Sequence, residues 1–441
     1  MTKGKASRKK TLKENSRRNL NINKKSVSIP FGAKIEGDYF PPPSKSFAIR
    51  CLIIASFCKK ESLIRNLGNS EDVKATLKII EKWCKIEKKY GQVLVKPSMN
   101  RRPPDGRYFA KGSATLARFL MAIFSFLEGE RVIDGDENLR KRDFSSSISV
   151  AKSLGAQIYE LGEKGKLPIK IKGKKPQNKE IEICDPLSSQ FASGVLIALS
   201  LLKKKFVVKV KNDVSFPYVK MTEKVMKLFG VKITSSEKKF VIEKSNLQGI
   251  DIEVEKDYSN ASFFIAGAVA SGGKIRIYGL DKNSFQGDIK ILKILKSLEV
   301  NIKWNDNFLE VWGAPANGMN VDIKETPDLL PPLSVIALKC PKDSIFSGVS
   351  RLKEKESSRS EILAKAINKI GGKSKISEDI LKITPSISYK GATLDPKNDH
   401  RMAMTFAMFG VLAKGTKVRN CDCVKKSYPN FWKDFGKILK T

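Results

Sequence analysis

Histidine is almost absent from this chain of 441 residues, which contains only His400. A single imidazole argues against a histidine cluster that binds metal and against triad chemistry. The seven cysteines form no C-x-x-C pair, their spacing is irregular, and most of them lie in apolar stretches. This usage predicts reduced, buried thiols in a cytoplasmic protein rather than a disulfide framework.

Long apolar runs are also absent. The longest runs, such as residues 192–202, are too short for a membrane-spanning helix, which needs ~20 apolar residues. Residues 1–25 contain almost no apolar side chains and one acid, Glu14, but ten Lys and Arg. That composition predicts a disordered basic tail and lacks the apolar core of a secretory signal, although a transit peptide stays open.

Positive charge is what the chain has in excess. Lys and Arg outnumber Asp and Glu by 83 to 46, which gives a formal net charge of +37. Such an excess indicates an anionic partner, which is a nucleic acid, a membrane surface or a phosphorylated small molecule. The basic residues are spread along the chain and are not interleaved with aromatic residues, which disfavours a nucleic-acid-binding module.

A join between a helix and a strand recurs about every seventy residues. In each case an amphipathic helix ends in a bulky apolar residue, which is usually followed by Gly and a short strand. The marker residues are Trp83, Leu154, Phe229, Leu298, Ile370 and Phe435. Six such units, in a chain too long for one simple domain, predict an α/β protein with two domains of three units each.

Apolar periodicity predicts the main elements inside these units. The predicted helices are Phe47–Phe57, Thr115–Phe126, Gln190–Leu202, Ala261–Ala270, Leu330–Leu338 and Met402–Leu412. The predicted strands are Phe206–Val210, Lys274–Tyr278, Phe308–Val311 and Leu381–Thr384.

Short polar segments open several of these helices. Asn-Asp-His-Arg at 398–401 precedes the helix from Met402, and Lys45, Ser46 and Arg50 open the first helix, where we expect Ser46 to be the cap. Cationic side chains beside the free N–H groups of a helix N-terminus form an anion site. The alternative at each place is an ordinary capped helix with exposed charges.

Two further segments carry acids. Asp328 lies among apolar residues in Thr326–Leu333, where burial is expected to raise its pKa into a range useful for a base. The alternative is an aspartate that caps a helix. Residues 351–359 hold several charges and include Glu356, and the alternative there is a solvated charge run.

In order and spacing, these segments resemble the enolpyruvyl transferase family, and within it the members that act on shikimate 3-phosphate. The resemblance covers residues 27–440, and its most specific part is the intact Asn-Asp-His-Arg-Met-Ala-Met at 398–404. The other matching residues are Lys45, Ser46, Arg50, Ala114, Thr115, Arg118, Arg142, Ser188, Ser189, Gln190, Ser215, Tyr218, Asp328, Lys355, Glu356, Arg359 and Lys426.

The resemblance implies a two-domain inside-out α/β barrel with six βαβαββ units, three per domain. Helix N-termini would face a cleft between the domains. The chain would cross between domains near residues 43 and 256. One domain is therefore expected to comprise 26–43 and 256–441, and the other 44–255, after the tail 1–25.

The reaction implied by the resemblance is transfer of the enolpyruvyl group from phosphoenolpyruvate to the 5-hydroxyl of shikimate 3-phosphate, with release of phosphate. The catalytic residues implied are Asp328 as base, Glu356 as acid, and Lys45. The residues implied for phosphoenolpyruvate are Lys45, Ala114, Arg142, Gln190, Arg359, Arg401 and Lys426. Those implied for shikimate 3-phosphate are Lys45, Ser46, Arg50, Ser188, Ser189, Gln190, Ser215, Tyr218, Asp328 and Lys355.

No metal and no organic cofactor is expected, and we expect a cytoplasmic monomer that binds neither nucleic acid nor membrane. The nearest alternative is the related transferase that acts on UDP-N-acetylglucosamine. That enzyme is expected to have Lys-Asn where this chain has Lys45 and Ser46, and a loop cysteine in a region where this chain has none between Cys84 and Cys184.

The chain departs from the family pattern at four positions. Ala114 replaces a Gly beside the phosphoenolpyruvate pocket, and Phe216 replaces a residue that is often basic. Asp143 replaces a usual Pro, and Ser358 replaces a usual Asp.

Overall fold

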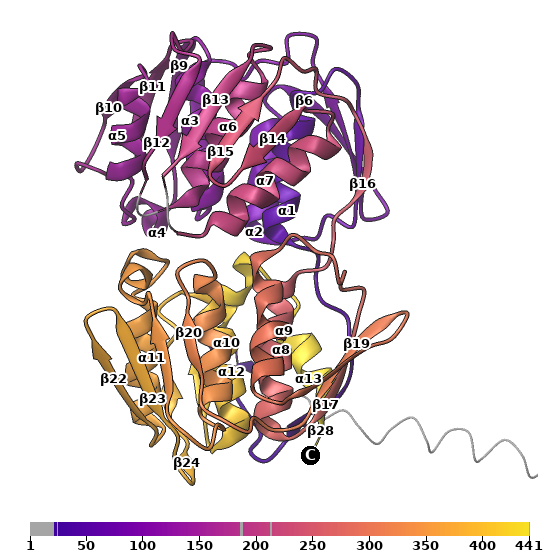
Figure 1. Ribbon diagram of the computed structural model, residues 1–441, viewed down its shortest axis with the longest axis vertical. Coiled ribbons are helices and arrows are strands. Elements are labelled where there is room, and N and C mark those ends of the chain that lie inside the picture. The colour runs from indigo at the N-terminus through magenta and orange to yellow at the C-terminus, as the bar shows by residue number, and fades with distance from the viewer. Residues whose placement is uncertain (1–21, 24, 186–187, 212–213, 441) are drawn as a thin grey trace, which may run out of the picture.

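The computed structural model describes residues 22–23, 25–185, 188–211 and 214–440. The chain forms two lobes stacked along its long axis (Figure 1). Most of the predicted tail 1–25 lies outside the described residues, but Ile22 and Asn23 form strand β1 (Ile22–Asn23), which pairs with Val27 and Ser26. Within the described ranges, no helix is both long and apolar enough to cross a membrane.

The upper lobe in Figure 1 is built by the middle of the chain around apolar helices. Helix α3 (Ala114–Phe126) is buried on every side except at Thr115, which is typical of a helix at the centre of a domain. Ser113 caps it by accepting a hydrogen bond from the Leu116 amide. The other helices of this lobe are α1 (Lys45–Ala55), α2 (Glu71–Ile80), α4 (Glu137–Arg140), α5 (Ser145–Ser153), α6 (Ser189–Ser200) and α7 (Phe216–Leu228).

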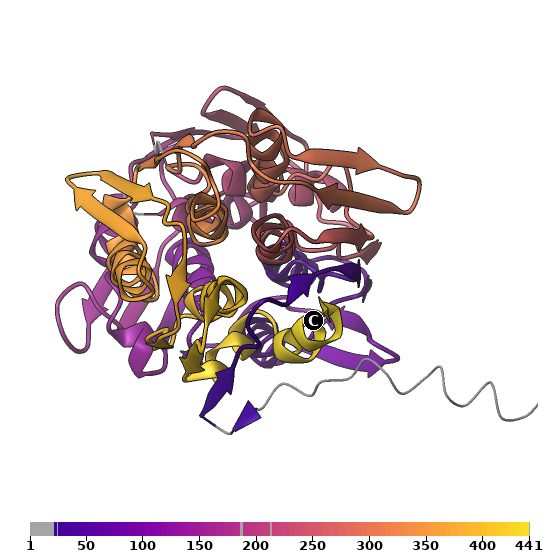
Figure 2. The same ribbon diagram turned by 90° about the horizontal axis from the view of Figure 1, so that it is seen from below.

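The lower lobe contains the remaining helices. These are α8 (Tyr258–Ser271), α9 (Lys290–Ser297), α10 (Leu330–Ala337), α11 (Arg359–Lys369), α12 (His400–Leu412) and α13 (Phe431–Ile438). Short 3-10 helices are η1 (Gly287–Ile289), η2 (Pro327–Leu329), η3 (Ser350–Glu354) and η4 (Cys421–Lys426). Seen along the long axis, helices of this lobe stand end-on and strands lie outside them (Figure 2).

Three four-stranded sheets surround the helices of the upper lobe. Their orders are β16-β5-β7-β6, β10-β11-β9-β8 and β12-β13-β15-β14. The strands are β5 (Ser62–Arg65), β6 (Cys84–Lys89), β7 (Gln92–Pro97), β8 (Gly106–Phe109), β9 (Gly129–Asp134), β10 (Gln157–Glu160), β11 (Ile169–Gly173), β12 (Glu180–Ile183), β13 (Phe206–Val210), β14 (Ile233–Ser236), β15 (Lys239–Ile242) and β16 (Asp251–Glu253).

The lower lobe has three four-stranded sheets of the same kind, with orders β18-β19-β17-β4, β20-β21-β23-β22 and β1-β2-β27-β25, and two short pairs, β24-β26 and β28-β3. The strands besides β1 are β2 (Ser26–Ser28), β3 (Lys34–Ile35), β4 (Gly37–Tyr39), β17 (Lys274–Tyr278), β18 (Asn301–Trp304), β19 (Phe308–Trp312), β20 (Asn320–Asp322), β21 (Ser344–Ser347), β22 (Lys373–Ser377), β23 (Ile380–Thr384), β24 (Tyr389–Lys390), β25 (Thr393–Leu394), β26 (Ala413–Lys414), β27 (Lys417–Arg419) and β28 (Leu439–Lys440).

Each four-stranded sheet of the described chain has one parallel pair and two antiparallel pairs, so the same local topology occurs six times. Parallel pairs require a crossover connection, and helices α3, α6, α10 and α12 supply it for the pairs β8-β9, β12-β13, β20-β21 and β25-β27. The predicted α/β class is therefore confirmed.

The predicted helix-to-strand join is confirmed in four units. Leu154, Phe229, Leu298 and Ile370 are the C-cap residues of α5, α7, α9 and α11, and a residue with positive φ follows each of them. The predicted position of the join is wrong in the first and last units. Trp83 lies in a turn beyond α2, and Gly436 lies within α13 because that helix continues to Ile438.

Each lobe has its own apolar core. One cluster of buried residues runs from Phe47 to Val254, and the other combines Val27–Tyr39 with Tyr258–Ile438. Where the chain passes between lobes, its two segments lie antiparallel and pair through Pro43 and Lys256.

Two local expectations are wrong. Ser46 does not cap the first helix, because the helix begins at Lys45 and Ser44 takes the N-cap position after the proline run 41–43. Cys184 is exposed, although the other cysteines are buried or half-buried thiols.

Candidate active site

A cleft between the lobes collects the residues that the sequence singled out. Every predicted site residue lines it, from Lys45 in the upper lobe to Lys426 in the lower lobe. The full lining is Lys45, Ser46, Arg50, Asp72, Ala114, Thr115, Arg142, Ser188, Ser189, Gln190, Ser215, Tyr218, Pro327, Asp328, Arg351, Lys355, Glu356, Arg359, His400, Arg401 and Lys426.

Helix N-termini supply much of this lining. Lys45, Ala114 and Ser189 are the first residues of α1, α3 and α6, and Arg359 is the first residue of α11. Asp399 caps α12 by accepting a hydrogen bond from the Arg401 amide at 2.9 Å, so the Arg401 side chain stands in the first turn of that helix. Helix N-termini carry partial positive charge, which adds to the charge of these side chains.

The cleft is strongly cationic. Eight Lys and Arg side chains line it, against the three carboxylates of Asp72, Asp328 and Glu356. Residues 351–359 are not a solvated run, because Arg359 is only 2% exposed and its neighbours Lys355 and Glu356 are half-buried. An excess of buried positive charge at helix N-termini favours multiply charged anions.

Asp328 is held between two arginines. Its Oδ1 accepts from Arg359 Nη1 at 2.7 Å, and its Oδ2 lies 2.9 Å from Arg401 Nη2. Burial raises the pKa of Asp328, but the charges of Arg401 and Arg359 lower it by more. The pKa therefore lies well below its ordinary value. The expected rise in this pKa is therefore wrong, because two buried guanidinium groups outweigh the apolar surroundings.

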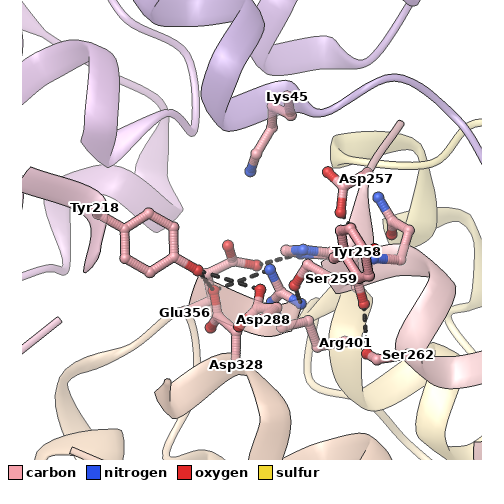
Figure 3. A network of polar contacts seen from close by, with 12 residues as sticks. Lys45, Tyr218, Asp257, Tyr258, Ser259, Ser262, Asp288, Asp328, Glu356 and Arg401 are labelled. Carbon is pink, nitrogen blue, oxygen red and sulfur yellow. Dashed lines mark hydrogen bonds and ion pairs between the residues drawn. The ribbon is translucent and has the colours of Figure 1, made fainter. Parts of the chain in front are cut away.

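Tyr218 links Asp328 to a second acid. Its hydroxyl lies 3.4 Å from Asp328 Oδ2 and 3.3 Å from Asp288 Oδ2 (Figure 3). Asp288 Oδ1 is buried and has no hydrogen-bond partner among the described residues. Burial and the charge of Asp328 raise the pKa of Asp288 to about 6, against a lowering by Arg401.

The raised pKa of Asp288 gives a prediction about stability. The unfolded chain releases this proton near pH 3.8 and the folded chain near 6, so folding loses stability as the pH rises between those values. Asp288→Asn removes the buried charge and is expected to gain up to ~3 kcal/mol relative to wild type between about pH 4 and about pH 8. Urea unfolding at both pH values measures this gain. A stability difference that does not change with pH contradicts the prediction.

Glu356 lies among cations on the other side of the cleft. Its Oε2 lies 2.8 Å from His400 Nδ1, and its Oε1 lies 3.0 Å from Lys426 Nζ. Burial raises the pKa of Glu356, but His400 and Lys426 lower it more, so the pKa is well below its ordinary value. Burial lowers the pKa of His400, which the Glu356 carboxylate only partly offsets.

Three donors in this region lie close enough to hold a metal ion. They are Glu356, Asp399 and His400, whose ligand atoms lie within 4.8 Å of one another. Lys426 and Arg359 already contact the two carboxylates, since Arg359 Nε donates to Asp399 Oδ2 at 2.7 Å. These cations oppose the entry of another positive ion.

Lys45 and Arg50 are fixed by upper-lobe residues. Lys45 Nζ lies 2.9 Å from Asp72 Oδ2, and its side chain points down towards the acids of the lower lobe (Figure 3). Burial lowers the pKa of Lys45, but Asp72 and Glu356 raise it by more. Arg50 is 1% exposed and donates to Thr222 Oγ1 at 2.7 Å and to the Ser46 and Tyr218 carbonyls.

Gln190 is oriented by two neighbours. Arg118 Nη1 donates to Gln190 Oε1 at 3.1 Å, and Gln190 Nε2 donates to Thr115 Oγ1 at 2.8 Å. Arg118 itself is buried and also donates to the Asp143 carbonyl. Arg118 therefore acts from behind the cleft wall.

Five lining residues have no predicted role in the site. Thr115 is among the residues that match the family pattern, and Pro327, Arg351 and His400 lie inside the polar segments described above, so a signal for these four is present in the sequence. Asp72 has no such signal, because it follows the cap of α2 at Ser70 like an ordinary first-turn acid. Only the pairing with Lys45 reveals it.

Fold and site together define a class of protein with two α/β lobes and a cationic cleft between them. The chain matches the family EPSP synthase (3-phosphoshikimate 1-carboxyvinyltransferase) over residues 30–435. It therefore belongs to the EPSP synthase family.

Two relatives carry the name 3-phosphoshikimate 1-carboxyvinyltransferase. The chain is 34% identical to the protein of Clostridium kluyveri, over 92% of this chain and 95% of that protein. It is 33% identical to the protein of Pyrococcus furiosus, over 92% and 98%. The solved EPSP synthase from Acinetobacter baumannii has the same fold, with a TM-score of 0.77, 24% identity, and coverage of 95% of this chain and 98% of that one.

Proposed function

We propose that the chain transfers the enolpyruvyl group of phosphoenolpyruvate to the 5-hydroxyl of shikimate 3-phosphate and releases inorganic phosphate. The observation that carries the proposal is that every residue predicted as catalytic or substrate-binding, from both lobes, lines one cationic cleft. Membership of the EPSP synthase family supports the same substrates. This reaction belongs to the shikimate pathway of aromatic amino acid biosynthesis.

The proposed chemistry has two stages. The 5-hydroxyl oxygen adds to C2 of phosphoenolpyruvate, while the hydroxyl proton leaves and the methylene carbon C3 gains a proton. C3 then loses a proton, the C2–O bond to phosphate breaks, and the enol ether forms. The site must therefore supply a base, an acid that later acts as a base, and cations for the departing phosphate.

Asp328 is the proposed base for the 5-hydroxyl. Arg359 and Arg401 keep its carboxylate ionised at neutral pH, because they lower its pKa. An ionised carboxylate can accept the hydroxyl proton when the neighbouring cations stabilise the anionic transition state. Its 19% side-chain exposure leaves it open to the cleft.

Glu356 is the proposed acid for the methylene carbon, with Lys45 opposite it. The pKa of Glu356 is low because His400 and Lys426 contact it. Phosphoenolpyruvate brings negative charge that would compete for Lys426 and Arg359, which raises the pKa of Glu356 in the complex. Protonation of Glu356 is thus coupled to substrate binding.

Phosphoenolpyruvate is assigned to the cations around Glu356. Arg142, Arg359, Arg401 and Lys426 come from four segments and all line the cleft. Lys45, Gln190 and Ala114 complete the proposed set. Guanidinium groups bind carboxylate and phosphate oxygens in pairs, which fits a compact ligand with both groups.

Shikimate 3-phosphate is assigned to the other half of the cleft. Most of its proposed ligands carry hydroxyl, amide or cationic groups near the N-termini of α1, α6 and α7, and Asp328 and Lys355 join them from the lower lobe. They are Lys45, Ser46, Arg50, Ser188, Ser189, Gln190, Ser215, Tyr218, Asp328 and Lys355.

We also propose the finer architecture implied by the family resemblance. Each lobe would be an inside-out α/β barrel of three βαβαββ units, with domains at 26–43 plus 256–441 and at 44–255. The repeated sheet topology and the separate cores support this division. The cytoplasmic location, the monomeric state and the lack of nucleic-acid binding stay predictions.

A coupled assay for phosphate release tests the proposed function. The protein is incubated with phosphoenolpyruvate and shikimate 3-phosphate, and then with each alone and with UDP-N-acetylglucosamine in place of shikimate 3-phosphate. Release that requires both first substrates supports the proposal. Release with the UDP-sugar instead would contradict it.

Ala114 gives a prediction about inhibition. It is buried in the cleft wall as the first residue of α3, where the family resemblance implies Gly. A Cβ placed on Gly112, two residues earlier, would lie 3.7 Å from Lys426 Nζ, so this turn adjoins the proposed phosphoenolpyruvate ligands. The extra methyl group should exclude glyphosate, the longer known inhibitor of the family, more than phosphoenolpyruvate.

Ala114→Gly is therefore expected to increase glyphosate inhibition, whereas wild type is expected to be weakly inhibited and active. Removal of one methyl group is worth ~10-fold in affinity in such a pocket. Inhibition curves at varied phosphoenolpyruvate measure the change. Equal and tight inhibition of both proteins would show that the methyl group does not face the inhibitor.

A further inference from the structure

A separate cavity lies at the end of the upper lobe away from the cleft. Helices α1, α3 and α6 begin at the cleft, and the cavity is lined by Phe57, Leu127 and Leu201, which lie within two residues of the C-terminal ends of the same helices. Helices of 11 to 13 residues are roughly 16–20 Å long, so the two sites are distinct. The cavity has a volume of about 290 Å³, close to the lower end of the range for small-molecule sites.

One part of the cavity wall is apolar. Phe57 and Leu247 are less than a tenth exposed, and Leu127 and Leu201 are half-buried. These four side chains belong to the apolar core of the upper lobe or pack against it, so the fold fixes their positions. An apolar group that contacts this wall leaves water, which favours its binding.

Basic side chains form another part of the wall. They are Lys59, Arg101, Arg102, Lys175 and Lys203, and Glu128 is the one carboxylate among the described lining residues. Glu128 already contacts two of these cations, because its Oε1 lies 3.3 Å from Lys175 Nζ and its carbonyl accepts from Arg102 Nη2. Lys59, Arg101 and Lys203 have no carboxylate within ion-pair distance in the described ranges.

The cavity keeps a net positive charge when the helix ends are counted. The C-terminus of a helix carries about half a negative charge, and three helices end here. Together with Glu128, these helix ends offset about half of the five positive charges. Arg101 is also half-buried, so a bound anion would replace part of the water that its charge has lost.

We propose that this cavity binds a small organic anion. Its apolar body lies against Phe57 and Leu247, and its carboxylate or phosphate group lies among Lys59, Arg101 and Lys203. A nucleic acid fits less well, because the phenylalanines that line the cavity are too buried for a base to stack on them. The proposal does not depend on the proposed function, since no residue assigned to the substrates lines this cavity.

Trp83 provides a local signal for binding. Its ring centroid lies 5.8 Å from that of Phe57, and its Nε1 donates to the Ser56 carbonyl at 3.2 Å. The other three tryptophans of the chain, at 304, 312 and 432, lie in the lower lobe. Fluorine NMR of the full chain with 5-fluorotryptophan therefore separates the cavity from the rest of the protein, and Trp83→Phe assigns its resonance.

Phenyl phosphate and benzoate are the test compounds, and each should shift the Trp83 resonance with saturation. Phenol, which lacks the charge, and inorganic phosphate, which lacks the apolar body, should need at least ~10-fold higher concentrations. Lys203→Gln and Arg101→Gln should each weaken binding by ~3–10-fold. Lys204→Gln and Arg107→Gln are the matched controls, with no change expected, because both residues are exposed and neither lines the cavity.

Four results would overturn the proposal. The first is a Trp83 resonance that neither compound shifts, and the second is a shift confined to the lower-lobe tryptophans, which would place the compounds elsewhere. The third is an equal response to phenol or to inorganic phosphate, which would show that only the apolar wall or only the charge matters. The fourth is a shift caused by a single-stranded oligonucleotide but not by phenyl phosphate, which would assign the basic residues to a nucleic acid.

Discussion

Replacing Asp328 by asparagine is expected to lower kcat by ~10²–10⁴-fold while the fold stays intact. The amide has nearly the same shape and can still accept from Arg401, but it cannot take the proton of the 5-hydroxyl. Arg359 keeps its pairing with Asp399, so the substitution does not leave that buried guanidinium without an anion. Turnover of purified enzyme at saturating substrates measures the loss.

Asp306→Asn is the matched control for this experiment. Asp306 is exposed in the turn between β18 and β19 and is not among the residues that line the cleft, so the same chemical change there should leave kcat unaffected. Thermal unfolding of both variants checks the fold. Near-wild-type turnover in Asp328→Asn would remove this carboxylate from the proposed chemistry, whatever the control shows.

Local patterns in the sequence predicted most of the elements that build the cleft. β13 and β17 have the predicted bounds, because alternating apolar residues describe a strand with one buried face. α3 and α6 begin one residue before their predicted starts, since the first helical residue is polar or small and adds nothing to the apolar pattern. The polar segments at the helix starts contain many of the residues that line the cleft.

Properties that depend on distant residues could not be predicted. The low pKa of Asp328 arises because α11 and α12 bring Arg359 and Arg401 to it, whereas its own neighbours in sequence are apolar. Asp72 is paired by a lysine from another helix, and Arg351 by a serine from the other lobe. Apolar periodicity describes one helix or strand at a time, so it predicts none of these partners.

Glu356→Gln is expected to lower kcat by ~10²–10⁴-fold through loss of the proton donor to C3 of phosphoenolpyruvate. The glutamine can still accept a hydrogen bond from Lys426 and contact His400, so both neighbours keep a polar partner. Binding of shikimate 3-phosphate should stay within a few-fold of wild type, because Glu356 is not among its proposed ligands. Loss of turnover with retained binding is thus the signature of this role.

Exchange of hydrogen at C3 tests the role directly. Reversible protonation by Glu356 predicts that wild type exchanges the methylene hydrogens of phosphoenolpyruvate with deuterium from solvent when shikimate 3-phosphate is present, as proton NMR would detect. Glu356→Gln should slow this exchange as much as turnover, whereas Glu361→Gln, a half-exposed change two residues after Arg359 in α11, should not. Exchange at the wild-type rate in Glu356→Gln would assign the C3 proton to another group, and Lys45, which faces Glu356 from the upper lobe, would then be the next residue to change.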